Sequence, residues 1–316
     1  MTILVLGSKG LAGSAICRNL ELNNRKFIGA SRNDVDLLNK KAVDDYFNRI
    51  KPKIVIGAAA LVGGMAANIK HPVEFLLNNI TIQNNTILSS FNNDVEKFLF
   101  LGSSCVYPGK ANSPITEDQL LTGPLEKTNE AYAIAKISGI KLIQSFRDEY
   151  DKKWVSVMPT NLYGPGDNFD VTNSHVLAAL IRKFYEATSQ QKSEVELWGS
   201  GKPRREFMHA DDFASAITFV MDNYNDREPL NIGTGTDISI KELAEMIANI
   251  SDYKGSIKWN SDVPDGTFQK LLSVSKLNKM GWQSKIALEE GIKSTYDWFI
   301  HNYEKTRLNV PVNLSI

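Results

Sequence analysis

Residues 3–13, Ile3-Leu4-Val5-Leu6-Gly7-Ser8-Lys9-Gly10-Leu11-Ala12-Gly13, contain the pattern that decides the fold. Four apolar residues in a row are typical of a strand that is buried on both faces, and the apolar residues from Leu11 to Leu22 recur at helical spacing. Glycines between a strand and a helix permit a tight turn, where backbone N–H groups of the helix N-terminus can bind phosphate. The stretch therefore predicts a strand, a phosphate-binding turn and a helix.

The same alternation continues along the first half of the chain. We expect strands at 2–6, 27–31, 53–59, 97–102 and 154–158, and helices at 11–22, 41–50, 72–92 and 130–150. Strands that alternate with helices build parallel βαβ units. The sequence thus predicts an α/β fold with a Rossmann-type doubly wound parallel sheet.

Beyond Pro159 the pattern becomes irregular, and residues 161–174 are rich in Gly, Pro, Asn and Asp, as in a loop. Further helices are expected at 175–188, 211–223 and 239–250, with strands at 194–198 and 229–232. We expect a smaller α/β domain that is interleaved with the first. The first domain would comprise 1–165 and about 208–230, and the second 166–207 and 231–316.

Composition excludes several classes of function. The 316 residues are 42% hydrophobic, and 36 Lys and Arg balance 36 Asp and Glu, so no net basic field attracts nucleic acid or a membrane surface. The longest apolar stretch, residues 54–67, is shorter than the ~20 residues of a membrane span. The first residues enter a strand without a secretory leader, and two cysteines are too few for a disulfide framework or a zinc motif. We therefore expect a cytoplasmic enzyme without a metal.

The glycine turn predicts a dinucleotide site with G-x-x-G-x-x-G spacing. Glycines that serve only strand-to-helix packing are the alternative. NAD-binding proteins hold the ribose hydroxyls with a carboxylate at the end of the second strand, but this strand ends at Gly29-Ala30-Ser31-Arg32. Arg32 and Lys9 can instead bind a 2′-phosphate, although Asp34 and Asp36 lie nearby. The sequence therefore favours NADPH over NADH.

A second group of residues predicts proton transfer beside a carbonyl. If residues 98–108 continue as a strand, Ser103 and Cys105 point to one face and Ser104 to the other. Tyr132 and Lys136 are four residues apart, hence on one face of the expected helix. An adjacent ammonium would lower the pKa of the tyrosine and make it a usable acid and base. A chance Y-x-x-x-K pair in a helix is the alternative.

The order of the glycine turn, Ser103, Tyr132 and Lys136 resembles the extended short-chain dehydrogenase/reductases. Other motifs narrow the resemblance to the GDP-L-fucose synthase family, and it runs along nearly the whole chain. The motifs are 102–108 (Gly-Ser-Ser-Cys-Val-Tyr-Pro), 128–130 (Thr-Asn-Glu), 132–136, 158–165, 173–176 (Asn-Ser-His-Val), 198–201 (Trp-Gly-Ser-Gly) and 205–207 (Arg-Glu-Phe).

This resemblance implies epimerisation of GDP-4-keto-6-deoxy-D-mannose at C3 and C5, followed by NADPH-dependent reduction at C4. Cys105 would be the base and His175 the acid of epimerisation. Ser103 and Tyr132 would bind the C4 oxygen, Tyr132 would supply the proton for reduction, and Lys136 would lower its pKa and bind the nicotinamide ribose. Without the resemblance, Cys105 reads as a small buried hydrophobe and His175 as a helix-start residue.

The glycine turn, the end of the second strand and the resemblance together predict the residues that bind each ligand. Those for NADP are Gly7, Ser8, Lys9, Gly10, Leu11, Ala12, Gly13, Arg32, Leu101, Gly102, Ser103, Ser104, Lys136, Pro159, Thr160, Asn161, Leu162 and His175. Those for the GDP-sugar are Lys183, Trp198, Arg205 and Asp265. Trp198 can alternatively be a core residue and Asp265 a turn former. The family usually has arginine where this chain has Lys9, and lysine supplies charge without the bidentate fork.

Two rival functions share most of these motifs. A GDP-L-colitose synthase-like enzyme would epimerise only C5 of a 3-deoxy sugar before it reduces C4. A non-catalytic nucleotide-binding scaffold would need none of the intact acid and base residues. By the same resemblance, helices 72–92 and 130–150 would form the contact of a homodimer.

Overall fold

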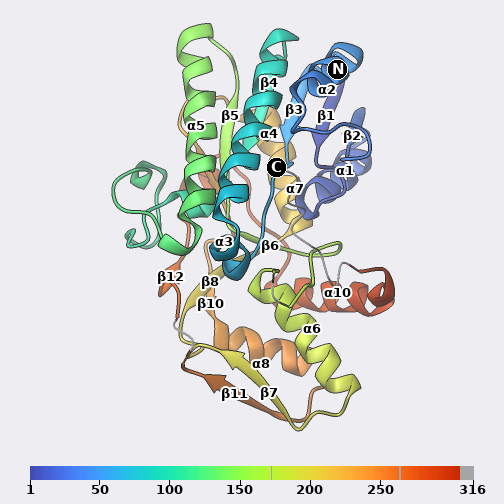
Figure 1. Cartoon of the computed structure of the whole chain (residues 1–316), viewed down its shortest axis with the longest axis vertical. Coiled ribbons are helices and arrows are strands. Elements are labelled where there is room, and N and C mark those ends of the chain that lie inside the picture. Colours follow the sequence, from blue (N-terminus) through green and yellow to red (C-terminus); the bar gives the residue numbers. More distant parts are fainter. Residues whose placement is uncertain (172, 263–264, 307–316) are drawn as a thin grey trace.

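The computed structural model describes residues 1–171, 173–262 and 265–306. A six-stranded sheet with the order β2-β1-β3-β4-β5-β9 forms the centre of the larger part of the molecule (Figure 1). Every pairing in this sheet is parallel. The predicted α/β class with a Rossmann-type sheet is therefore confirmed. The strands are β1 (Ile3–Leu6), β2 (Phe27–Ala30), β3 (Ile54–Gly57), β4 (Lys97–Leu101), β5 (Val155–Pro159) and β9 (Leu230–Ile232).

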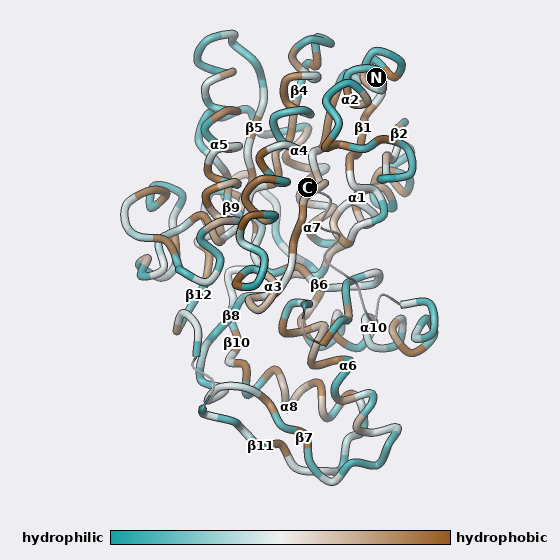
Figure 2. Tube along the Cα trace, in the orientation of Figure 1, coloured by the Kyte–Doolittle hydropathy of each residue, from teal (hydrophilic) through white to brown (hydrophobic). Residues whose placement is uncertain are grey.

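Helices cover both faces of this sheet. On one face α1 (Leu11–Leu22) packs with α7 (Ala210–Asn223), and on the other α4 (Pro72–Asn92) packs between α2 (Lys40–Ile50) and α5 (Glu130–Tyr150). Each interface has its own apolar core, and Figure 2 shows hydrophobic residues along the packed elements with hydrophilic ones at the outer loops. No helix in the described part of the chain is long and apolar enough to span a bilayer.

A smaller part of the molecule lies below the carboxyl ends of these strands in Figure 1. It contains a four-stranded sheet, a strand pair and three helices around a third apolar core. The sheet consists of β6 (Asn161–Tyr163), β8 (Arg204–His209), β10 (Asp237–Ser239) and β12 (Gln269–Lys270), and the pair of β7 (Glu194–Trp198) and β11 (Ser256–Asn260). The helices are α6 (Val176–Ser189), α8 (Ile240–Ile250) and α10 (Leu288–His301).

Short helical segments complete the described chain. They are α3 (Met65–Lys70), α9 (Ser275–Lys279) and the 3₁₀ segments η1 (Ser104–Val106), η2 (Glu117–Gln119), η3 (Lys127–Asn129) and η4 (Tyr303–Lys305).

One buried carboxylate joins the strands of the smaller sheet. Glu206 on β8 is fully buried, and its side chain accepts hydrogen bonds from the backbone N–H groups of Thr234, Gly235 and Leu272 at 2.6, 2.7 and 3.0 Å. Burial raises the pKa of this carboxyl, and the three donors oppose that shift. The bonds hold the segment after β12 against β8, which also carries Arg205.

The structure corrects the expected strand at residues 98–108. β4 ends at Leu101, and the chain enters the 3₁₀ turn Ser104–Val106, so strand alternation does not place Ser103 and Cys105 on one face. Val106 and Tyr107 are buried, and this apolar run made the segment look like a continued strand. The structure also contains elements that we did not predict, namely α3, α9, α10, β6, β8, β10, β11 and β12.

Candidate functional site

A cavity of about 640 Å³ lies at the carboxyl edge of the large sheet and extends into the smaller part of the molecule. Ligands of open α/β sheets bind at this edge, where the strand order reverses. Most predicted site residues line it: Gly10, Leu11, Ala12, Leu101, Gly102, Ser103, Ser104, Cys105, Tyr132, Lys136, Pro159, Thr160, Asn161, Leu162, His175, Lys183, Trp198, Arg205 and Asp265. Gly7, Ser8, Lys9, Gly13 and Arg32 do not line it.

The glycine turn has the shape that a dinucleotide pyrophosphate requires. Gly7 has a φ of +81°, and a Cβ there would lie 2.8 Å from the backbone of Ala59, so only glycine fits. A Cβ on Gly13 would lie 2.2 Å from the carbonyl oxygen of Gly7, so Gly13 serves close packing of α1. The N-cap of α1, Gly10, makes no side-chain capping bond, and the first turn has no acidic residue. The free N–H groups of this helix end therefore fit a phosphate.

The two carboxylates that follow β2 both accept hydrogen bonds within their own loop. Asp34 accepts hydrogen bonds from the backbone N–H and the hydroxyl of Ser31 at 2.8 and 2.7 Å. The Asp36 carboxylate accepts the N–H of Leu38 at 3.0 Å. Arg32 lies exposed in the same loop. The exposed Arg32 guanidinium is the cation in this loop that suits a 2′-phosphate.

Ser103 and Cys105 meet through the 3₁₀ turn rather than through strand alternation. The Ser103 hydroxyl accepts a hydrogen bond from the backbone N–H of Cys105 at 3.3 Å, which caps the turn. This bond brings the Ser103 Oγ within 2.9 Å of the Cys105 Sγ. The prediction that the two side chains share one wall therefore agrees with the structure, but the physical reason we gave for it is wrong.

Tyr132 lies on the same wall, where α5 begins. Its ring packs edge-on against Phe75 with centroids 6.3 Å apart, and Cys105 packs against the same small apolar cluster. Burial raises the pKa of the Tyr132 phenol well above its usual value, and the neighbouring Ser103 only partly opposes this effect. The phenol is thus protonated at neutral pH, as a proton donor must be.

The pKa of Tyr132 is raised rather than lowered beside Lys136, contrary to our prediction. The Lys136 Nζ donates a hydrogen bond to the carbonyl oxygen of Leu101 at 2.8 Å and lies 5.8 Å from the centre of the Tyr132 ring. Burial also lowers the pKa of Lys136 itself, to about 8. The ammonium is therefore directed at the backbone of β4, and burial penalises the charged form of both groups.

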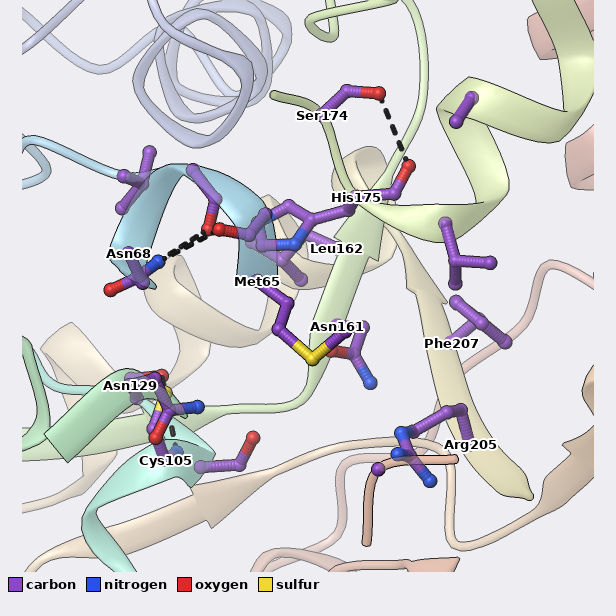
Figure 3. Close-up of a pocket in the computed structure, with 18 of the residues that line it drawn as sticks. Met65, Asn68, Cys105, Asn129, Asn161, Leu162, Ser174, His175, Arg205 and Phe207 are labelled. Carbon is purple, nitrogen blue, oxygen red and sulfur yellow. Dashed lines mark hydrogen bonds between the residues drawn. The ribbon is translucent and has the colours of Figure 1, made fainter. Parts of the chain in front are cut away.

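His175 comes from the opposite side of the cavity, at the N-cap of α6 (Figure 3). Its side chain is accessible from the cavity, yet the surrounding protein lowers the pKa of the imidazole below its usual value. The neutral form thus dominates at pH 7. A nearby anion, such as a diphosphate, would raise the pKa again and favour the protonated form that an acid needs.

Four predicted substrate residues surround the far end of the cavity. Lys183 lies over the Trp198 ring, with its Nζ 5.5 Å from the ring centre, and the tryptophan is 55% exposed. Trp198 is therefore not a core residue. Asp265 accepts bonds from the backbone N–H and hydroxyl of Ser200 at 2.9 and 2.6 Å, so it also ties two loops together. Arg205 is partly buried, and this lowers its pKa while Asp265 opposes the shift.

Several residues that line the cavity were absent from our predictions. Met65 and Asn68 come from the unpredicted helix α3, and Asn129 ends η3 beside the start of α5 (Figure 3). Asn129 occupies the N-cap of α5 but makes no capping bond, and its Oδ1 is buried without a hydrogen-bond partner among the described residues. The Gly63-Gly64 pair after β3 was the sequence signal that pointed to this loop.

The described ranges contain no group of three or more His, Cys, Asp or Glu side chains that could hold a metal ion. Both cysteines are free thiols.

Comparison with known proteins identifies the class first. Residues 3–233 match the model of the NAD dependent epimerase/dehydratase family. The chain belongs to this family.

Curated relatives define the group within it. The chain is 48% identical to "Putative GDP-L-fucose synthase 2" of Arabidopsis thaliana over 95% of this chain and 92% of that protein. It is 46% identical to GDP-L-fucose synthase of Escherichia coli K12, over 96% and 98%. GDP-L-colitose synthase of Yersinia pseudotuberculosis is 40% identical, over 95% and 98%. The predicted resemblance to the GDP-L-fucose synthases is therefore confirmed.

Solved structures share the whole architecture. The NADP-bound GDP-L-fucose synthetase of Naegleria fowleri aligns with a TM-score of 0.89 at 32% identity, over 97% of this chain and 96% of that one. A GDP-6-OMe-4-keto-L-xylo-heptose reductase of Campylobacter jejuni aligns with a TM-score of 0.90 at 35% identity, over 95% and 98%.

Proposed function

We propose that this chain epimerises C3 and C5 of GDP-4-keto-6-deoxy-D-mannose and reduces C4 with NADPH, giving GDP-L-fucose. The observation that carries the proposal is the single cavity in which Ser103, Cys105 and Tyr132 form one wall and His175 reaches in from the other. A base and an acid on opposite sides of one carbon can invert its configuration. A hydroxyl and a phenol at the same carbonyl serve both reactions.

Epimerisation uses the acidity of the C–H bonds next to the C4 ketone. The Cys105 thiolate removes the proton from C3 or C5, and the electron pair of the broken bond moves onto the C4 oxygen as an enolate. Hydrogen bonds from Ser103 and Tyr132 stabilise this charge. His175 returns a proton to the opposite face of the carbon, which restores the ketone with inverted configuration.

Reduction uses the same oxygen-binding groups. NADPH, when bound, supplies the hydride for C4. The alkoxide formed at C4 then takes the proton of the Tyr132 phenol, whose raised pKa keeps it protonated until that moment. The positive charge of Lys136, held at the Leu101 carbonyl, favours transfer of negative charge to the phenol oxygen.

NADP would be held at the carboxyl edge of the sheet. The turn Gly7–Gly13 supplies backbone N–H groups for the pyrophosphate, and Arg32 supplies a cation for the 2′-phosphate. The strand ends at 101–104 and 159–162, with Lys136 and His175, surround the remaining part. In this proposal residues 1–165 and about 208–230 form the NADP-binding domain.

We assign residues 166–207 and 231–316 to the second domain. The GDP-sugar would occupy the part of the cavity that this domain lines. Residues 172, 263–264 and 307–316 of this assignment lie outside the described residues. Lys183 and Arg205 supply cations for the diphosphate, the exposed Trp198 face supplies a stacking surface, and Asp265 accepts hydroxyl groups.

One experiment separates this function from its rivals. GDP-4-keto-6-deoxy-D-mannose and its 3-deoxy analogue are each supplied with NADPH, and the products are identified by NMR. We expect GDP-L-fucose from the first and much slower turnover of the second. Preferred turnover of the 3-deoxy sugar would indicate a colitose-type enzyme. No turnover of either, with NADPH bound, would indicate a non-catalytic scaffold.

Arg32→Ala is expected to weaken the binding of NADPH by about 10- to 100-fold, the loss of one charge-assisted bond pair. NADH lacks the 2′-phosphate, so its dissociation constant should stay nearly the same. Titration of both cofactors by fluorescence measures the preference. An unchanged ratio of the two constants would place the 2′-phosphate elsewhere.

Lys136 is expected to impose an alkaline limit on the reduction step. Its lowered pKa means that the ammonium is charged below a pH of about 8 and loses its proton as the pH rises through that value. The rate of NADPH oxidation with pre-epimerised sugar should therefore fall above this pH. Lys136→Arg keeps its charge and should lose the alkaline limb, even if it turns over more slowly. A wild-type rate that is flat through this range would contradict the assignment.

We further propose a homodimer that forms through α4 and α5. These helices expose large apolar residues, with Val73, Leu77, Leu88 and Ile134 between 40% and 60% exposed. An apolar surface of this kind on a packed helix pair suits a two-fold contact. Analytical ultracentrifugation would test it, and a monomer at working concentration would reject it.

The two free thiols support the cytoplasm as the location.

A further inference from the structure

We propose that the loop 61–68 positions His175 for proton transfer, through a backbone contact at Gly64 and a side-chain clamp at Asn68. The inference rests on the proposed function, because it assigns a purpose to the placement of His175 in that reaction. Gly64 and Asn68 act through another residue, so they are positioning residues rather than catalytic ones.

The contact at Gly64 joins segments that are far apart in the chain. The backbone N–H of Gly64 donates a hydrogen bond to the carbonyl oxygen of Asn173 at 2.8 Å. A Cβ on Gly64 would lie 2.4 Å from the carbonyl oxygen of Ser174. Real Cβ atoms do not approach a backbone oxygen this closely, so any side chain at position 64 must move the segment that leads into His175.

Asn68 holds the Gly63-Gly64 backbone in place. Its Nδ2 donates hydrogen bonds to the carbonyl oxygens of Gly63 and Gly64, both at 3.0 Å, and only 7% of the residue is exposed. Its Oδ1 is buried and has no hydrogen-bond partner among the described residues. A buried acceptor without a partner destabilises the fold. The Asn68 side chain therefore leaves its acceptor oxygen without a partner while it donates both hydrogen bonds to this loop.

The segment on the other side of the contact is equally constrained. The Asp170 carboxylate accepts a hydrogen bond from the backbone N–H of Asn173 at 2.7 Å. The backbone carbonyl oxygen of Asp170 accepts another from the backbone N–H of Ser174 at 3.1 Å. The imidazole of His175 makes no hydrogen bond to a described residue. The backbone of residues 173–175 therefore decides where the ring lies. In Figure 3 the His175 side chain extends from the start of α6 toward Met65 and Asn68.

These contacts link the two walls of the cavity. Residues 61–68 follow β3 in the large sheet, which also positions the wall of Ser103 and Cys105 through the adjacent β4. His175 begins α6 in the smaller part. A displacement of about 1 Å in an acid can reduce a rate by ~100-fold. The Gly64 contact thus sets the separation between base and acid. The rate of proton exchange depends strongly on this separation, and the rate of hydride reduction depends on it less.

The test compares two half-reactions in Gly64→Ala. Exchange of C3 and C5 protons is followed by NMR in D₂O with GDP-4-keto-6-deoxy-D-mannose and NADP⁺, and reduction by NADPH oxidation with pre-epimerised sugar. We expect exchange to fall by ~100-fold, while reduction and the dissociation constant of NADPH change by less than ~3-fold. Gly123→Ala is the matched control, since its Cβ would meet Pro108 only at an ordinary 3.4 Å.

A double-mutant cycle identifies His175 as the target. If Gly64 acts through His175, then Gly64→Ala in the His175→Asn background should cause little further loss of exchange. The inference would be overturned if the exchange losses of the two single variants multiplied in the double variant. It would also be overturned if Gly64→Ala lost exchange and reduction equally. If Gly64→Ala fails to fold in a thermal melt, Asn68→Ala replaces it in the same cycle, because it removes the two donor bonds without a clash or a buried charge. Unchanged exchange in that variant would also overturn the inference.

The same data separate this inference from the proposed function. Wild-type protein that exchanges neither C3 nor C5 would reject the function itself. Wild-type exchange that survives in Gly64→Ala and Asn68→Ala would reject only the positioning role.

Discussion

Cys105→Ser is expected to lose C3 and C5 proton exchange by ~100- to 10,000-fold, the range for removal of a positioned base. A thiol ionises near pH ~8.5, whereas an alcohol stays protonated throughout the accessible range. Serine is smaller than cysteine and can keep the hydrogen bond with the Ser103 hydroxyl beside the small apolar cluster. The loss should therefore be chemical rather than structural.

The reduction of pre-epimerised sugar measures the other half of the reaction. It should change by only a few-fold in Cys105→Ser, because the thiol moves carbon-bound protons and not hydride. Cys17→Ser provides the matched control, because Cys17 lies outside the cavity and packs against the apolar core between α1, α7 and the sheet. Burial raises the pKa of the Cys17 thiol to about 11. Equal loss of exchange and reduction in Cys105→Ser would show that Cys105 is not a dedicated epimerisation base.

Tyr132→Phe is expected to reduce the rate of C4 reduction by ~100- to 10,000-fold, because it removes the proton donor. The substitution keeps the ring that packs against Phe75 and the surrounding apolar cluster, so the fold and NADPH binding should be retained. Stopped-flow oxidation of NADPH with pre-epimerised sugar measures the step directly. Proton exchange should also slow, since the phenol is one of two donors to the enolate oxygen, but Ser103 remains.

Tyr150→Phe serves as the control for this variant. It removes a phenol at the far end of the same helix, where the side chain is 48% exposed. We expect both half-reactions to stay at the wild-type rate. Turnover of Tyr132→Phe within a few-fold of the wild type would contradict the assignment and transfer the proton donor to another group, with His175 as the first candidate.

The large sheet could be predicted because its signals are local. The apolar runs of β1, β3 and β4 and the helical patterns of α4 and α5 are each contained in one segment, and the bounds 72–92 and 130–150 match α4 and α5. Strands β6, β8, β10 and β12 are two to six residues long and obtain their pairing from distant segments, with Glu206 at their centre. Such strands have little periodicity of their own.

Two errors at the site have the same origin. We assigned Ser103 and Cys105 to a strand because the apolar residues Val106 and Tyr107 follow them, but these are buried by packing around a 3₁₀ turn. We assigned Lys136 the role of lowering the pKa of Tyr132 from a spacing of four. The spacing fixes only the helix face, whereas burial and the bond to Leu101 determine the charge and direction of the ammonium.

The sequence by itself determined which functional groups are present and in what order, and this order identifies the family. The groups are a glycine turn for phosphate, a hydroxyl, a thiol, a phenol, an ammonium and an imidazole. The sequence also determined the parallel sheet, because apolar periodicity is a local property. Only the tertiary structure decided how these groups face one another. His175 lies 70 residues from Cys105 in the chain, and the segment that leads into it is bonded through the Asn173 carbonyl to the N–H of Gly64. Distances between remote segments are set by packing, which no single segment encodes.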